Sequence, residues 1–220
     1  MERAVIFDMD GVLVDNNPWH IEAWTTFCER YSVHMSTEDI MSHFGNTNAD
    51  YLKFLFQRDL TIDEIKKYGE EKENIYREIY KNDIKPVKGL FELLNLLERE
   101  GYAIAVATSA PTVNVDFTLD GIGIKNRFHK IVDVTFVTKG KPNPEIYLLA
   151  AKMLDIPPRN CIVFEDSIHG VQAAVSAGMH TVGILTSQTS EKLATAHFLV
   201  TDFNEVTSEY LEKVLDNNFN

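Results

Sequence analysis

The chain has 220 residues, of which 45% are hydrophobic and 25% are charged, and its formal net charge is −12. This composition is typical of a folded protein with room for one core domain and a smaller insertion. The acidic balance argues against nucleic acid and anionic membranes as partners, since both need clustered basic side chains. No apolar run approaches the ~18 residues of a membrane span and no secretory signal is evident, so we expect a cytoplasmic protein.

The first predicted element is a buried strand at residues 4–7, which ends at Asp8. Continuous apolar runs of this kind are typical of strands covered on both faces. The region that follows differs, because its apolar residues recur at helical spacing without a convincing strand. Amphipathic helices are predicted there at 19–31, 36–44, 48–56 and 62–80. We therefore expect an α-helical cap domain, 16–84, inserted into a core domain made of 1–15 and 85–220.

Strands and helices alternate in the rest of the chain. Strands are predicted at 103–107, 161–164 and 181–185, with a short edge strand at 198–200, and helices at 90–99, 144–154 and 170–177. This alternation favours an α/β fold with a doubly wound, Rossmann-like parallel sheet. The two cysteines, Cys28 and Cys161, are predicted to be buried thiols and not a disulfide.

Polar side chains follow three of the predicted strands at the point where each strand ends. They are Asp8 and Asp10, Thr108 and Ser109, and Glu165 and Asp166. Ligands of open α/β sheets bind at the carboxyl ends of the strands, so we expect these side chains to lie together. Crowded carboxylates repel one another, and a hard divalent cation such as Mg²⁺ would offset that repulsion. With a cation beside it, a carboxylate can attack a phosphate and form an aspartyl-phosphate.

The same residues carry a resemblance. The run Asp8-Met9-Asp10-Gly11-Val12-Leu13-Val14-Asp15 resembles the first motif of the haloacid dehalogenase superfamily of hydrolases. Thr108 resembles the second motif, Lys141 in Lys139-Gly140-Lys141-Pro142-Asn143-Pro144 the third, and Phe164-Glu165-Asp166-Ser167 with Gly170 the fourth. Each residue alone is more often part of a turn, a helix cap or a solvated loop, and the family order of all four motifs makes the resemblance specific. The helical insertion is similar to the C1-capped subgroup, which includes β-phosphoglucomutase-like phosphatases and mutases.

The resemblance implies a role for each motif residue. Asp8 would be the nucleophile, and Asp10 the general acid and base. Mg²⁺ would contact the Asp8 side chain, the Asp10 backbone carbonyl and Asp166, with Glu165 in or near its shell. Thr108, the adjacent Ser109 and Lys141 would hold the phosphoryl group, and Gly11 would present its backbone amide there. Asn114 would contact the substrate or its phosphate.

The resemblance also implies substrate contacts from the cap at His20, Trp24 and Lys72. Each has an ordinary alternative, namely a helix-surface histidine, a tryptophan of the cap core and a solvated lysine. One position departs from the mutase pattern, because Asn48 stands where the mutase cap loop carries an arginine. A neutral amide cannot provide the charge-assisted, bidentate grip that a guanidinium gives a phosphate.

Three functions remain open at this point. The first is a Mg²⁺-dependent phosphatase of a small phosphorylated metabolite such as a sugar phosphate. The second is a β-phosphoglucomutase-like phosphosugar mutase. The third is a non-enzymatic phospho-acceptor module, although receivers of that kind lack a helical insert and a second aspartate two residues on. We expect a monomer or weak homodimer whose cap closes about hinges near Asn16 and Lys85, since excluding water favours phosphoryl transfer.

Overall fold

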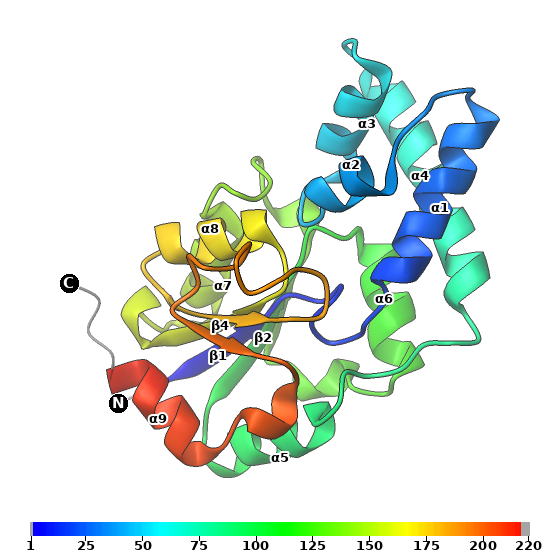
Figure 1. Cartoon of the computed structure of the whole chain (residues 1–220). Helices are drawn as coiled ribbons and strands as arrows, with labels where there is room; N and C mark the ends of the chain where they lie inside the picture. Colours follow the sequence, from blue (N-terminus) through cyan, green and yellow to red (C-terminus); the bar gives the residue numbers. More distant parts are fainter. Residues whose placement is uncertain (1, 217–220) are drawn as a thin grey trace.

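One parallel sheet organises the chain in the computed structural model, which describes residues 2–216 (Figure 1). Its strands are β1 (Ala4–Phe7), β2 (Ala103–Ala107), β3 (Lys130–Val132), β4 (Cys161–Glu165), β5 (His180–Ile184) and β6 (Phe198–Val200). Their order within the described residues is β3-β2-β1-β4-β5-β6. The first strand therefore lies between β2 and β4, the two other strands that end in polar side chains. This arrangement confirms the predicted α/β fold with a doubly wound sheet.

Helices cover both faces of the sheet. Alternate residues of β1 point to opposite sides, with Val5 and Phe7 in one cluster and Ala4 and Ile6 in the other. The first face packs against α5 (Leu90–Arg99), α6 (Thr112–Gly121) and α9 (Ser208–Asp216). The second face packs against α7 (Glu145–Leu154) and α8 (Ile168–Ser176). Burial on both sides explains why the strands are continuous apolar runs.

Four helices form a separate group beyond one end of the sheet, at the upper right of Figure 1. They are α1 (Asn17–Arg30), α2 (Thr37–Ser42), α3 (Asn48–Phe56) and α4 (Ile62–Tyr80). This group has its own aromatic-rich hydrophobic cluster. The chain crosses between core and helices twice, and the two crossings lie side by side, because Val14 bridges to Pro86 and the Val87 amide donates to the Leu13 carbonyl at 3.0 Å.

The predicted bounds agree with the observed elements for most helices. The predicted and observed bounds are identical for α3, α4 and α5, while β5 begins one residue earlier than expected. The pattern did not predict β3, α6 or α9. Strand β3 has only three residues and lies at the sheet edge, too short for a visible apolar run. Cys28 and Cys161 are buried free thiols, as predicted. None of the helices in the described part of the chain is long and apolar enough to cross a bilayer.

Candidate active site

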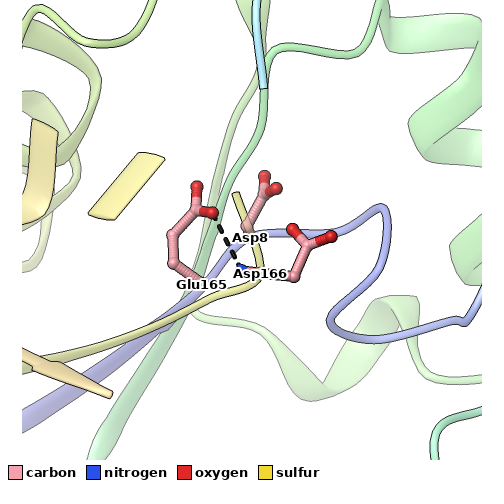
Figure 2. A group of neighbouring side chains, drawn as sticks. All are labelled: Asp8, Glu165 and Asp166. Carbon is pink, nitrogen blue, oxygen red and sulfur yellow. Dashed lines mark hydrogen bonds between the residues drawn. The ribbon is translucent and has the colours of Figure 1, made fainter. Parts of the chain in front are cut away.

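Three carboxylates meet at the carboxyl edge of the sheet. Asp8 follows β1, Glu165 is the last residue of β4, and Asp166 comes next. One oxygen from each lies within 4.8 Å of the others, and all three side chains are buried. Figure 2 shows them together and marks the hydrogen bond that the Asp166 amide donates to Glu165 at 3.0 Å. The expected convergence of these strand ends is therefore observed.

Lys141 supplies the positive charge inside this cluster. Its Nζ lies 3.0 Å from Asp8 Oδ1 and 2.6 Å from Glu165 Oε1, and the residue is 3% exposed. Burial by itself would lower the pKa of Lys141, but the two carboxylates outweigh burial and raise it. The lysine is therefore charged and held beside the predicted nucleophile.

Glu165 is saturated by hydrogen bonds from the protein. Its Oε1 accepts from Lys141 and from the Tyr147 hydroxyl at 2.7 Å. Its Oε2 accepts from the backbone amides of Asp166 and Ser167 and from the Ser167 hydroxyl. A carboxylate has about four lone-pair sites, so little capacity remains for a metal ion. This geometry favours Glu165 as the group that positions Lys141, and leaves Asp8 and Asp166 to face a cation.

The charge of the cluster fits a divalent cation. Burial raises the pKa of Asp8 to about 7. Burial, together with the charges of Glu165 and Asp8, raises the pKa of Asp166 well above its ordinary value. Both pKa shifts arise mainly from burial, and the charges of the neighbouring carboxylates add to it. The donors are all oxygen atoms, which suits a hard ion such as Mg²⁺.

Two glycines allow the backbone to approach these carboxylates closely. Gly11 has φ +74°, and a Cβ at this position would overlap the Asp166 carboxylate. Its amide donates to Asn16 Oδ1 at 3.0 Å. A Cβ on Gly170, in the first turn of α8, would overlap the Glu165 carboxylate. Since Glu165 is fixed by its hydrogen bonds, it cannot move aside without disturbing Lys141.

Gly170→Ala is therefore expected to destabilise the protein by about 1–3 kcal/mol, the usual cost of overpacking. Gly69→Ala is the matched control, because Gly69 also lies in a helix but its added Cβ would make an ordinary contact, 3.7 Å from Asn48. That control should be stabilising by roughly 0.5–1 kcal/mol, as alanine favours helix. Thermal unfolding of both variants measures the difference, and equal melting temperatures would contradict the proposed fixed position of Glu165.

Asp10 is held by residues at the start of α1. Its Oδ1 accepts from Asn16 Nδ2 at 2.6 Å and lies 3.6 Å from His20 Nε2. Burial would raise the pKa of Asp10, but the nearby His20 ring and the hydrogen bond from Asn16 hold it below its ordinary value. His20 itself stacks on Tyr76, with ring centroids 3.9 Å apart. The second predicted catalytic aspartate is thus a carboxylate whose direction is set by α1 and α4.

The predicted cap residues lie close to one another. Lys72 Nζ is 3.2 Å from His20 Nδ1 and 4.9 Å from the Trp24 ring centroid. Lys72 is 2% exposed, so the alternative of a solvated lysine is wrong. Trp24 stacks on Tyr51 with ring centroids 4.0 Å apart, so it belongs to the cap core while also lining the cavity.

A cavity of about 70 Å³ lies between the carboxyl edge of the sheet and the helices α1–α4. The predicted residues that line it are Asp8, Asp10, His20, Trp24, Lys72, Thr108, Ser109, Asn114 and Asp166. Gly11, Lys141 and Glu165 are not among its lining residues. Ser109 joins the two walls, since its hydroxyl donates to the Gly45 carbonyl at 2.7 Å. The amide of Asn114 is engaged by two cap residues, donating to Glu73 and accepting from Arg77.

Several residues of the site were not predicted. Asn16 holds Asp10, Asn17 and Ser187 donate to Asp166, and Tyr147 donates to Glu165. Asn16 and Asn17 follow the first motif directly, so their position was an available signal. Tyr147 and Ser187 are far away in the sequence, and only the fold brings them to the site. Glu73 follows Lys72 in a run rich in acids, where nothing distinguishes it from its neighbours.

The chain is similar in sequence to known proteins of one family. The family model described as haloacid dehalogenase-like hydrolase matches residues 5–184. The chain is 35% identical to a phosphorylated carbohydrates phosphatase of Thermotoga maritima over 82% of its length and 83% of that protein. It is 31% identical to a beta-phosphoglucomutase of Bacillus subtilis over 96% of its length and 94% of that protein.

A solved structure shows the same architecture over nearly all of the chain. It is a hydrolase of this superfamily from Entamoeba histolytica, 33% identical, with a TM-score of 0.89 over 99% of this chain and 100% of that one. The four motifs occur in the family order, and their residues meet at one edge of the sheet. The similarities to known proteins point to the same family. The chain belongs to the haloacid dehalogenase-like hydrolases, and it is an enzyme and not a non-enzymatic phospho-acceptor module.

Proposed function

We propose that the protein is a Mg²⁺-dependent phosphatase that hydrolyses a small phosphorylated metabolite, a sugar phosphate, through an aspartyl-phosphate on Asp8. The observation that carries the proposal is the placement of Asp8. It is buried 3.0 Å from the Lys141 ammonium, and Asp10 lines the same cavity. Residues 16–84 form the cap domain over this cavity in our proposal, and residues 1–15 and 85–220 form the core domain.

The first half of the reaction transfers the phosphoryl group to the protein. An Asp8 oxygen attacks phosphorus, and the bond from phosphorus to the leaving oxygen breaks. Protonated Asp10 gives its proton to that oxygen. Asp10 is a carboxylate in the free site, and an arriving phosphate raises its pKa because like charges disfavour ionisation. Lys141 and Thr108 hold the oxygens of the transferring group as charge develops on them.

The second half of the reaction releases phosphate. Asp10 is now a carboxylate and accepts a proton from water, whose oxygen attacks phosphorus while the bond to Asp8 breaks. Glu165 keeps Lys141 in place through both halves. Asp8, Asp166 and the Asp10 carbonyl are the proposed Mg²⁺ ligands, and bound Mg²⁺ supplies positive charge that lets the Asp8 carboxylate approach an anionic phosphate.

A phosphate-release screen over sugar phosphates, nucleotides and pyrophosphate tests the proposal. We expect release from sugar monophosphates in the presence of Mg²⁺ and its loss on chelation. Asp10→Asn should lower the rate by about 10²- to 10⁴-fold, the usual contribution of a general acid and base. Failure of the unmodified protein to release phosphate from any compound would overturn the proposal.

The alternative is a phosphosugar mutase, which the similarity to the B. subtilis mutase favours. The cap loop argues against it, because Asn48 replaces the expected arginine and its amide donates to Glu73 at 2.7 Å. β-Glucose 1-phosphate separates the two functions when phosphate release and glucose 6-phosphate formation are measured in one reaction. We expect release to dominate, and isomerisation faster than release would establish the mutase.

A further inference from the structure

Glu73 places a buried carboxylate in the cap wall of the active-site cavity. It lies in α4, is 4% exposed and lines the cavity beside Lys72. A series of contacts leads to it from the catalytic aspartates: Asp10 to His20 at 3.6 Å, His20 to Lys72 at 3.2 Å, and Lys72 to Glu73 at 2.7 Å. The carboxylate therefore lies beyond the reaction centre, where the part of a substrate remote from the transferring phosphate would be bound.

The hydrogen bonds of Glu73 leave one position open. Its Oε1 accepts from Lys72 and, at 2.7 Å, from Asn48 Nδ2. Its Oε2 accepts from Asn114 Nδ2 at 2.6 Å. Three of about four lone-pair sites are thus occupied, and the fourth, on Oε2, can accept one more hydrogen bond. A hydroxyl group can donate there, whereas a phosphate dianion has no proton to offer.

The cations near Glu73 are already engaged. Lys72 is the lysine among the residues lining the cavity, and its ammonium is paired with Glu73 and lies against His20 and Trp24. Arg77 does not line the cavity, and it donates to Asn114 Oδ1. A second phosphate arriving here would meet the like charge of Glu73 at low dielectric. To bind Lys72 it would have to break a buried ion pair, which is strongly unfavourable.

We infer that Glu73 determines specificity by rejecting bisphosphorylated substrates and accepting a neutral hydroxyl of a monophosphorylated one. The inference rests on the proposed function, and it narrows the substrate class to monophosphates whose remote end carries hydroxyl groups. The inference also gives Asn48 and Asn114 a role. Their side-chain amides position the Glu73 carboxylate, which excludes a second phosphate. Discrimination of this kind is achieved by repulsion as well as by attraction.

Binding measurements in a variant that cannot turn over test the inference without relying on activity. In an Asp8→Asn background, calorimetry would give dissociation constants for fructose 6-phosphate, fructose 1-phosphate and fructose 1,6-bisphosphate with Mg²⁺ present. We expect the bisphosphate to bind at least about tenfold more weakly than the better monophosphate. Adding Glu73→Gln, which removes the charge and keeps the shape, should shrink that ratio by about tenfold, or 1.4 kcal/mol.

Glu70→Gln is the matched control, because Glu70 is exposed on the same helix one turn earlier, and it should leave the ratio unchanged. The inference is wrong if the bisphosphate binds as tightly as the monophosphates, if none of the three binds, or if Glu73→Gln weakens all three equally. The last result would assign Glu73 a purely structural role beside Lys72. Selective binding without phosphate release by the unmodified protein would support the inference and overturn the proposed function instead.

Discussion

Replacement of Asp8 by asparagine is expected to lower phosphate release by on the order of 10⁴-fold or more while the protein stays folded. The loss follows because an amide cannot serve as the nucleophile, and removing one member of a catalytic unit can cost nearly as much as removing all of it. Steady-state rates of both proteins on the best substrate of the screen measure it. Asp15→Asn is the control, since Asp15 lies in the same motif but is exposed.

The melting temperature of Asp8→Asn distinguishes a loss of catalysis from misfolding. Burial raises the pKa of Asp8 from 3.8 to about 7, so its ionised form destabilises the folded state. Without metal, that cost is absent below pH ~4, grows as the pH rises towards 7, and is then fully present. Asp8→Asn removes it. At pH 8 in a chelating buffer, the variant should therefore melt at a temperature equal to or higher than the unmodified protein, and a lower melting temperature would contradict this account.

Replacement of Lys141 by methionine is expected to reduce both activity and stability. Methionine fills similar space but leaves Asp8 and Glu165 without the cation that lies 3.0 and 2.6 Å from them. Breaking a buried ion pair usually costs about 3–5 kcal/mol. Loss of a group that stabilises transition-state charge lowers kcat by about 10²- to 10³-fold. Thermal unfolding and steady-state kinetics measure the two effects.

Two further variants control this experiment. Lys139→Met changes an exposed lysine of the same loop and should behave like the unmodified protein. Lys141→Arg keeps the charge, so it should retain more stability than Lys141→Met while losing activity, because a guanidinium does not fit the position of an ammonium. Mg²⁺ should raise the melting temperature of Lys141→Met more than that of the unmodified protein. Unchanged kcat in Lys141→Met would overturn the role assigned to the lysine.

The sequence by itself predicted the strands of the sheet apart from β3, and the edge of the sheet where the site lies. Apolar runs that end at Asp8, Thr108 and Glu165 predict buried parallel strands, and the ends of such strands meet at one edge for geometric reasons. The bounds of most helices could also be predicted, since capping residues and apolar spacing are local, although α6 and α9 were missed. In α4, Thr61 and Glu64 form the capping box that starts the helix. Lys141 was predicted through its motif, although its ion pairs could not be.

Tertiary structure alone decided which way the site's side chains face and what surrounds them. Glu165 and Asp166 are adjacent in the sequence, yet one is saturated by Lys141 and Tyr147 while the other faces the cavity. Glu73 is one acid among several in α4, and it becomes a candidate specificity residue only because Asn48 and Asn114 approach it from other elements. Such contacts join residues far apart in the chain, so packing determines them, and local sequence preferences do not.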